Sequence, residues 1–265
     1  MAATIVQEYT PPAPFVDPRR LPYTELLEAA FPEIRRELLA VIGQKRWSPY
    51  LDRQAYRGTA MYFLLYARGR KNRSACRLCP VTTKVLEGIP HIRQAVFGYL
   101  GPGAYISPHR GSAGVLRVHL GLVAEPGKAG WRVGGETREC AEGRVVVFED
   151  GCRHEAWNRS DTHRVTLICD PPAPHLRSGD VPRVLETYEK EFGAAYLLHT
   201  WAKSKPPGHP VRRFVIPLLL RLEPIVSTLD RVFFPLALFF YNRFSARQVP
   251  IGAAATGRWE GTPGG

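Results

Sequence analysis

Two histidines, His109 and His154, are the residues of this chain best suited to metal chemistry. His109 follows the tripeptide Ile-Ser-Pro, and His154 follows shortly after the acid Asp150 at the end of an apolar run. An antiparallel sandwich can bring together two strands that are far apart in the sequence. Because neutral imidazole is a common iron ligand, the pair predicts a mononuclear metal site. Either histidine alone could equally be an ordinary strand side chain.

Two arginines lie inside apolar segments, Arg117 in VLRVHLGL and Arg164 in HRVTLICD. A buried arginine is costly unless an anion pairs with it. That anion could be a structural aspartate of the same region or a bound carboxylate, whose two oxygens match the guanidinium fork. His119 is expected on the same strand face as Arg117. Together, two histidines and two in-strand arginines indicate a non-haem iron site with an oxo-acid beside it.

Short apolar runs separated by turn residues predict the strands that would position these groups. Spacings near ten residues are typical of an antiparallel sandwich or jelly roll. The predicted strands are 95–100, 116–123, 131–133, 144–149, 154–158 and 164–170. The predicted helices are 24–42, 80–88 and 181–202. The 24 Gly and 24 Pro residues disfavour an all-helical bundle.

The chain of 265 residues divides into four predicted regions. A helical and loop region packs on the core, a β core follows, and then come a helical, apolar and basic segment and a disordered tail. Their bounds are 1–90, 91–172, 173–248 and 249–265. The start lacks a basic and apolar leader, and the five cysteines are an odd number, so we expect a reducing, cytoplasmic setting. The Cys76–Cys79 pair has no second pair to complete a zinc site.

The net charge of +12 favours anionic partners, and residues 201–265 contribute half of it. Within them, residues 212–244 are apolar with basic flanks, but the longest uncharged apolar run covers only 232–241. A bilayer-spanning helix needs about 20 residues. Two alternatives stand: peripheral contact with a membrane surface, or a cover for this domain or a partner subunit. The aromatic residues are not interleaved with cations, which disfavours nucleic acid.

Three stretches resemble the aspartyl/asparaginyl β-hydroxylase family, namely PHRGSAGVLRVHLGL, EGRVVVFEDGCRHEAWN and HRVTLICD. The resemblance covers about residues 60–172 and leaves the last region unexplained. It implies a mainly β fold with flanking helices around a double-stranded β-helix core. It also implies an iron(II)- and 2-oxoglutarate-dependent dioxygenase that uses O2 to hydroxylate an unactivated C–H bond.

Carried over by position, the resemblance makes His109 and His154 the catalytic iron ligands. It also assigns 2-oxoglutarate binding to Arg117, His119 and Arg164, and it makes Asp150 the acid that supports a ligand histidine. Most such oxygenases carry an acid two residues after the first histidine, where this chain has Gly111. The resembled family includes members that use two histidines alone, and Glu155 or Asp150 is the alternative source of a third, carboxylate ligand.

The substrate remains open between a peptidyl Asp or Asn, a membrane-lipid acyl chain and a small molecule. Family members that act on peptides tend to carry a second arginine where this chain has Val115. Another branch resembles lipid A 2-hydroxylases, whose substrate fits the apolar, basic-flanked segment. Two other classes of function stand beside these: a non-catalytic cupin-like module that binds anions, and a membrane-surface protein.

Overall fold

The computed structural model describes residues 13–50 and 56–191. Beyond these it describes only 208–210, 213–214, 217–218, 221, 234–236, 239 and 247–250. The structure of the chain is given by these residues alone.

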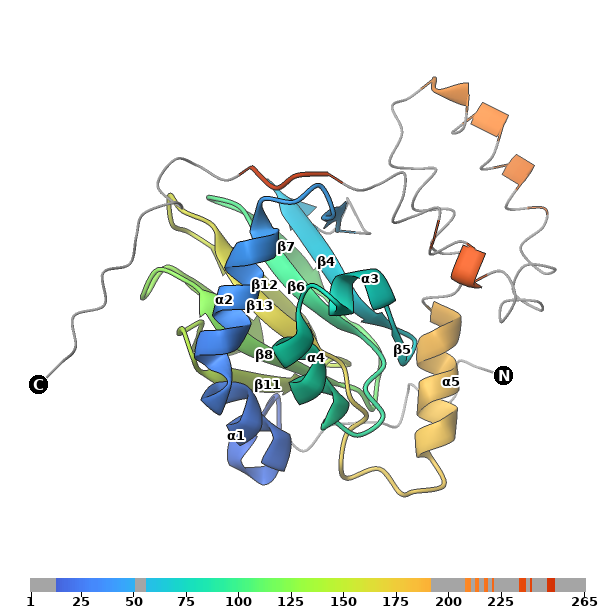
Figure 1. The fold of residues 1–265 in the computed structure, drawn as a ribbon. Coiled ribbons are helices and arrows are strands. Elements are labelled where there is room, and N and C mark those ends of the chain that lie inside the picture. Colours follow the sequence, from blue (N-terminus) through green and yellow to red (C-terminus); the bar gives the residue numbers. More distant parts are fainter. Residues whose placement is uncertain are drawn as a thin grey trace, which may run out of the picture.

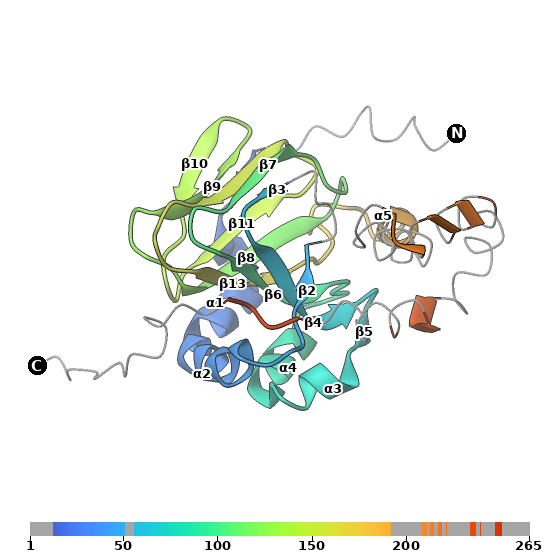
Figure 2. The same cartoon turned by 90° about the horizontal axis from the view of Figure 1, so that it is seen from above.

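Two antiparallel sheets face each other and form a double-stranded β-helix (Figure 2). The larger has the order β1-β11-β8-β13-β6-β4-β2, with β5 paired to β4. Its strands are Phe15–Val16, Val145–Glu149, Leu116–Val123, Arg164–Cys169, Ala95–Leu100, Ala60–Ala67, Ser48–Pro49 and, for β5, Arg70–Lys71. The smaller has the order β10-β9-β12-β7-β3. Its strands are Glu136–Glu139, Ala129–Val133, His154–Asn158, Tyr105–His109 and Tyr56–Arg57. The predicted fold class is therefore confirmed.

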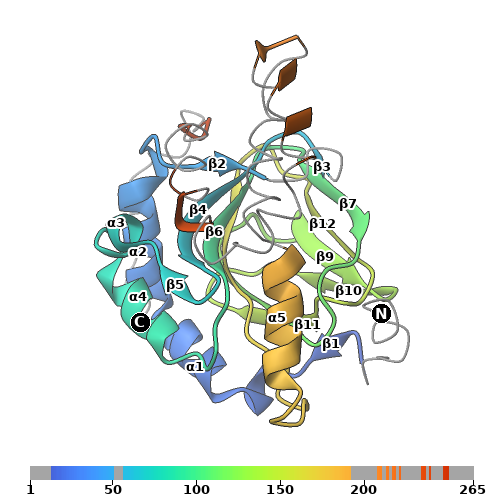
Figure 3. The same ribbon diagram turned by 90° about the vertical axis from the view of Figure 1, so that its right-hand side faces the viewer.

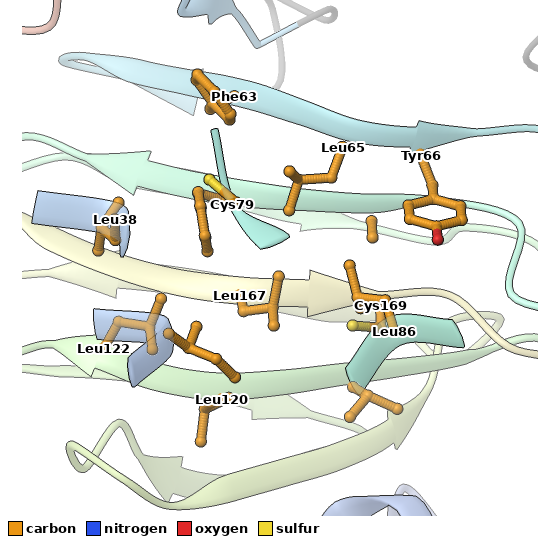
Figure 4. Close-up of a cluster of buried hydrophobic side chains, with 14 of the residues drawn as sticks. Leu38, Phe63, Leu65, Tyr66, Cys79, Leu86, Leu120, Leu122, Leu167 and Cys169 are labelled. Atoms are coloured by element: carbon orange, nitrogen blue, oxygen red, sulfur yellow. The ribbon is translucent and has the colours of Figure 1, made fainter. Parts of the chain in front are cut away.

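Four helices cover the outer face of the larger sheet (Figure 1). They are α1 (Pro22–Ala29), α2 (Phe31–Ile42), α3 (Arg73–Cys76) and α4 (Pro80–Glu87), and a 3-10 turn, Pro18–Arg20, precedes them. Alternate strand residues such as Phe63, Leu120 and Leu167 meet helix residues such as Leu38 in one buried cluster (Figure 4). The opposite residues of the same strands face the smaller sheet. This alternation leaves the inner face free for polar side chains.

Predicted and observed elements differ at a few places, each with a physical reason. The predicted helix 24–42 is two helices, because Pro32 lacks the N–H that would bond back to Glu28. Strands β6, β8 and β12 have the predicted bounds, whereas β7 and β10 were not predicted. The expected core boundary at residue 91 falls inside the larger sheet, since β4 pairs with β6. All five cysteines are buried free thiols.

The C-terminal region touches the β-helix at several places, among them the Phe234 ring, which lies 4.4 Å from the Arg68 guanidinium. Helix α5 (Val181–Glu191) stands in front of the two sheets in Figure 3. The rest of the predicted helix 181–202 lies outside the described residues. Further on, the backbone of Arg247 exchanges hydrogen bonds of 3.0 and 2.7 Å with Trp47, and the Tyr99 hydroxyl donates to the Pro250 carbonyl at 2.8 Å. In the described part of the chain, no helix is long and apolar enough to cross a bilayer.

A buried carboxylate joins two of the covering helices. Glu37 of α2 is 8% exposed and accepts hydrogen bonds from the backbone N–H groups of Val81 and Thr82, at 2.7 and 2.9 Å, and from the Thr82 hydroxyl at 2.6 Å. No side chain of α4 itself caps its first turn. Glu37 therefore satisfies the free N–H groups of another helix, and its charge suits the positive end of the helix dipole.

We expect Glu37→Gln to lower the free energy of unfolding by about 1–3 kcal/mol, because the amide loses the charge and one acceptor oxygen. Urea denaturation measures this, with the exposed Glu33→Gln of the same helix as the control. Equal stability of the two variants would contradict this role of Glu37.

Candidate active site

The two predicted ligand histidines meet at one end of the smaller sheet. His109 is the last residue of β7, His154 is the first residue of β12, and the two are paired directly across the strands. Their ring centroids lie 4.2 Å apart. Antiparallel pairing thus closes the long separation in sequence.

Both rings have the same hydrogen-bond arrangement. The Nδ1 of His109 lies 2.9 Å from the Ser107 carbonyl, and that of His154 lies 2.8 Å from the Cys152 carbonyl. A carbonyl can only accept, so each Nδ1 is assigned the proton and each Nε2 keeps its lone pair. Burial lowers the pKa of His154 to about 4, which keeps that ring neutral. Ligand histidines commonly show this arrangement, in which the second nitrogen donates to a carbonyl.

Asp150 occupies the space beside this pair. It is fully buried, its Oδ1 lies 3.7 Å from the His154 Nε2, and its Oδ2 accepts from the Ser112 N–H at 2.9 Å. A Cβ placed on Gly111 would lie 1.9 Å from that Oδ2. The carboxylate of Asp150 therefore fills the volume that a side chain at position 111 would need. Among the described residues, no group of three His, Cys, Asp or Glu side chains is arranged as a complete metal site.

Glu155, the other acid next to a histidine, points away from the pair. Strand alternation puts it on the opposite face from His154. There its carboxylate accepts from the Tyr105 hydroxyl and forms an ion pair with Arg132. Glu155 therefore cannot serve as a third ligand in this arrangement.

The side chains of Arg117, His119 and Arg164 all face the smaller sheet, because their neighbours in β8 and β13 belong to the helix-facing cluster. The two arginines have different surroundings. The guanidinium of Arg117 lies between two fully buried acids, 3.0 Å from Asp150 and 3.3 Å from Asp170. The sequence left two partners open for each arginine, a structural aspartate or a bound carboxylate. The partner of Arg117 is the structural aspartate.

The two acids beside Arg117 respond differently to burial. For Asp150, burial opposes ionisation, but Arg117 and the other nearby donors hold its pKa below the usual range. For Asp170, burial dominates over Arg117 and raises the pKa to about 6. Asp150 has the shorter ion pair with Arg117 as well as a backbone N–H bond, which explains the difference.

Arg164 is 3% exposed and lacks such a counterion. Of the described residues, none offers an acceptor to its Nε or a carboxylate to its guanidinium. The guanidinium lies 4.1 Å from the ring centroid of Trp131, whose buried indole N–H also has no described acceptor. A buried cation without an anion is expensive, so this is where a bound anion would be stabilised.

A row of contacting rings connects Arg164 to the histidine pair. Trp131 contacts His119 at 4.7 Å, His119 stacks on Phe148 at 5.6 Å, and Phe148 contacts His154 at 4.9 Å, all between ring centroids. Burial, then the charges of Arg164 and Arg117, lower the pKa of His119 well below its usual value, so its ring is neutral. The inner face thus has a pair of nitrogen donors at one end and an unpaired cation at the other.

Asp170, which the sequence offers with Asp150 and Asp161 as a structural partner for an in-strand arginine, does pair with Arg117. Sequence reasoning missed three members of this site: Trp131, Phe148 and Tyr188. Tyr188 of α5 is buried and donates to the Asp170 Oδ2 at 2.8 Å. The signal available for Tyr188 was weak, namely apolar residues at helical spacing in a segment that is otherwise polar.

Comparison with known proteins identifies the family. Residues 28–174, more than half of the chain, match the model of the aspartyl/asparaginyl beta-hydroxylase family. This chain belongs to that family. The family resemblance predicted from the sequence is therefore confirmed.

Three relatives of this chain illustrate the range of proteins to which it is similar. Human aspartyl/asparaginyl beta-hydroxylase is 33% identical over 62% of this chain and 23% of its own length. The ornithine lipid ester-linked acyl 2-hydroxylase of Rhizobium tropici is 33% identical over 59% of each chain. Human aspartate beta-hydroxylase domain-containing protein 1 is 35% identical over 64% of this chain and 47% of its own. The chain spans less than two thirds of the length of each.

The packing of Gly111 against Asp150 leads to a stability prediction. We expect Gly111→Ala to lower the free energy of unfolding by about 1–3 kcal/mol, because the new methyl group would overlap a carboxylate that Ser112 and Arg117 hold in place. Gly179→Ala is the control, since a Cβ there meets nothing within 4 Å. Chemical denaturation compares the two variants. If Gly111→Ala is as stable as the control, Asp150 does not occupy this space.

Proposed function

We propose that this protein is an iron(II)- and 2-oxoglutarate-dependent hydroxylase of the aspartyl/asparaginyl type. The observation that carries the proposal is the contrast between the two arginines of the inner face: Arg117 faces two carboxylates, whereas Arg164 faces none. A dicarboxylate cosubstrate would supply the missing anion, and its other end would reach toward the paired histidines.

The donor set fits iron(II). His109 and His154 would hold the metal through their Nε2 atoms, since both Nδ1 atoms are engaged by carbonyl groups. Imidazole suits iron, and two protein ligands leave positions open for the cosubstrate and O2. The Asp150 carboxylate lies 3.7 Å from the His154 Nε2, the nitrogen that would bind the metal, so its charge would stabilise a cation held there by the two histidines. When bound, iron supplies the oxygen chemistry that couples decarboxylation of 2-oxoglutarate to C–H hydroxylation.

The remaining residues of the site bind and orient. Arg164 would pair with the distal carboxylate of 2-oxoglutarate through its guanidinium fork, next to the free indole N–H of Trp131. The neutral ring of His119 would line the pocket between them. Arg117 would hold Asp150 beside His154, and it remains a predicted contributor to the anion pocket. Trp131 and Phe148, each 1% exposed, would keep water away from this inner face.

Anaerobic titration with iron(II) and 2-oxoglutarate tests the proposal. We expect a weak visible metal-to-ligand charge-transfer band that His109→Ala and His154→Ala abolish. Arg164→Met should weaken 2-oxoglutarate binding at least about 30-fold, because truncating one partner of a buried charge pair costs 2 kcal/mol or more. Arg138→Met, at a half-exposed arginine on an edge strand, is the control. A chain that takes up no metal, even with excess iron, would leave a non-catalytic anion-binding module.

A second candidate substrate class, a lipid acyl chain, is favoured by two observations. Val115, at the position of the second arginine of peptide-directed relatives, is fully buried and apolar, so no cation there meets an acidic peptide. In the C-terminal region, four exposed apolar side chains occur with the exposed cations Arg213 and Arg221. The four are Phe214, Leu218, Leu236 and Phe239, at 66, 53, 51 and 60% exposure. Apolar and basic groups together suit an anionic lipid surface.

Vesicle sedimentation tests the lipid alternative. We expect the protein to sediment with vesicles of mixed neutral and anionic phospholipid, and the double variant Phe214→Ser with Phe239→Ser to lose most of this binding. Leu26→Ser with Leu39→Ser, exposed apolar residues on the covering helices, should bind like the unmodified chain. Absence of binding of the unmodified chain to these vesicles would leave a peptidyl Asp or Asn as the favoured substrate.

A further inference from the structure

We infer that Tyr188, on the helix beyond the family-matched region, is a positioning residue for Asp150, the carboxylate beside the Nε2 of the candidate metal ligand His154. This inference rests on the proposed function only for the identity of His154 as a ligand. The matched region ends at residue 174, whereas α5 covers Val181–Glu191. This helix therefore adds a contact to the site from outside the region that identifies the family.

A continuous buried polar chain connects Tyr188 to Asp150, next to His154. The Tyr188 hydroxyl donates to Asp170 at 2.8 Å, and Asp170 lies 3.3 Å from the Arg117 Nε. Arg117 lies 3.0 Å from Asp150, whose Oδ1 is 3.7 Å from the His154 Nε2. Tyr188, Asp170 and Asp150 are each at most 1% exposed, so water does not substitute for a lost partner.

The charges of this chain explain why the hydroxyl matters. Two carboxylates share one guanidinium, so the described ion pairs leave Asp170 less well compensated than Asp150. A tyrosine hydroxyl donated to Asp170 adds a neutral hydrogen bond without adding a charge. Without that bond, Asp170 is expected to draw Arg117 toward itself and away from Asp150. The Asp150 carboxylate would then shift relative to the His154 Nε2, the atom that would bind the metal.

The packing of α5 fixes Tyr188 against the same loop that holds Asp150. Gly114 has a φ of +77°, and a Cβ there would lie 3.1 Å from a methyl group of Val184 on α5. The Ala173 N–H donates to the Gly114 carbonyl at 2.9 Å, which ties the chain before α5 to this loop. Two residues earlier, Ser112 donates its backbone N–H to Asp150. Helix α5 and the Asp150 carboxylate are therefore held by one short segment.

Co(II) binding to the full chain tests the inference, with Tyr188→Phe as the variant. Loss of a direct outer partner of a metal ligand typically costs 10–100-fold in affinity. Tyr188 acts on Asp150 through two further residues, Asp170 and Arg117, so we expect a loss of about 3- to 10-fold. Tyr99→Phe is the matched control, because Tyr99 is equally buried and its hydroxyl also donates one 2.8 Å hydrogen bond, to Pro250. The Co(II) affinity of the control should stay within about twofold of that of the unmodified chain, since Tyr99 takes part in none of the four contacts that link Tyr188 to His154.

A second measurement uses the metal-free protein. Long-range ¹H–¹⁵N spectra report the environment and tautomer of the His154 ring, and we expect Tyr188→Phe to change them while Tyr99→Phe does not. Asp170→Asn interrupts the same polar chain. In the double variant, the effects of Asp170→Asn and Tyr188→Phe on Co(II) affinity should therefore be clearly less than additive. Should Tyr188→Phe fail to fold, Asp170→Asn alone is compared with the control.

The inference is overturned if Tyr188→Phe matches Tyr99→Phe in both measurements. Failure of the unmodified chain to bind Co(II) is a different result, because it contradicts the proposed function and leaves the metal-free spectra to decide the role of Tyr188. A change in those spectra would then still support a coupling between α5 and His154.

Discussion

The cost of burying charge inside a β-helix organises this molecule. Its inner face contains two arginines, and each must be compensated within a space closed off from bulk water. Arg117 is compensated by Asp150 and Asp170, and this triad fixes the acid beside the histidine pair. Arg164 has no such acid among the described residues, so the folded chain retains a buried preference for an anion. The first arginine holds an acid of the site in place, and we propose that the second selects the anion that binds there.

The scaffold provides this inner face by simple alternation. In β8 and β13, every second residue joins the apolar cluster beneath α1–α4, which leaves the intervening residues to face the smaller sheet. The smaller sheet then brings His109 and His154 together through antiparallel pairing. The helices are therefore needed for the chemistry only indirectly, since they bury one face of the larger sheet so that the other can be polar.

Much of this arrangement was predictable, and the exceptions have physical causes. Strands with clear apolar runs, such as β8, were predicted with the correct bounds, whereas β10 reads ETRE and is fully exposed at a sheet edge, so no hydrophobic pattern marks it. Burial of Arg117 and Arg164 followed from their apolar neighbours. Their different partners did not, because Asp150 and Asp170 are 33 and 53 residues from Arg117 and only the topology joins them.

Gly111 stands at the position where most such oxygenases carry a metal-binding acid. Its position suggested a deficient iron site, yet the carboxylate of Asp150, 39 residues further along the chain, fills the same volume. Sequence spacing describes local neighbours, whereas a jelly roll builds its site from several strands. The same reason explains why Tyr188, outside the family-matched region, could be connected to the site only through the structure.

The most direct test of this account is a crystal structure obtained without oxygen, with Mn(II) in place of iron and an unreactive analogue of 2-oxoglutarate. The account predicts the metal bound to the Nε2 atoms of His109 and His154, with the distal carboxylate of the analogue paired to Arg164. Metal bound elsewhere, or an analogue that leaves Arg164 without an anion, would contradict it.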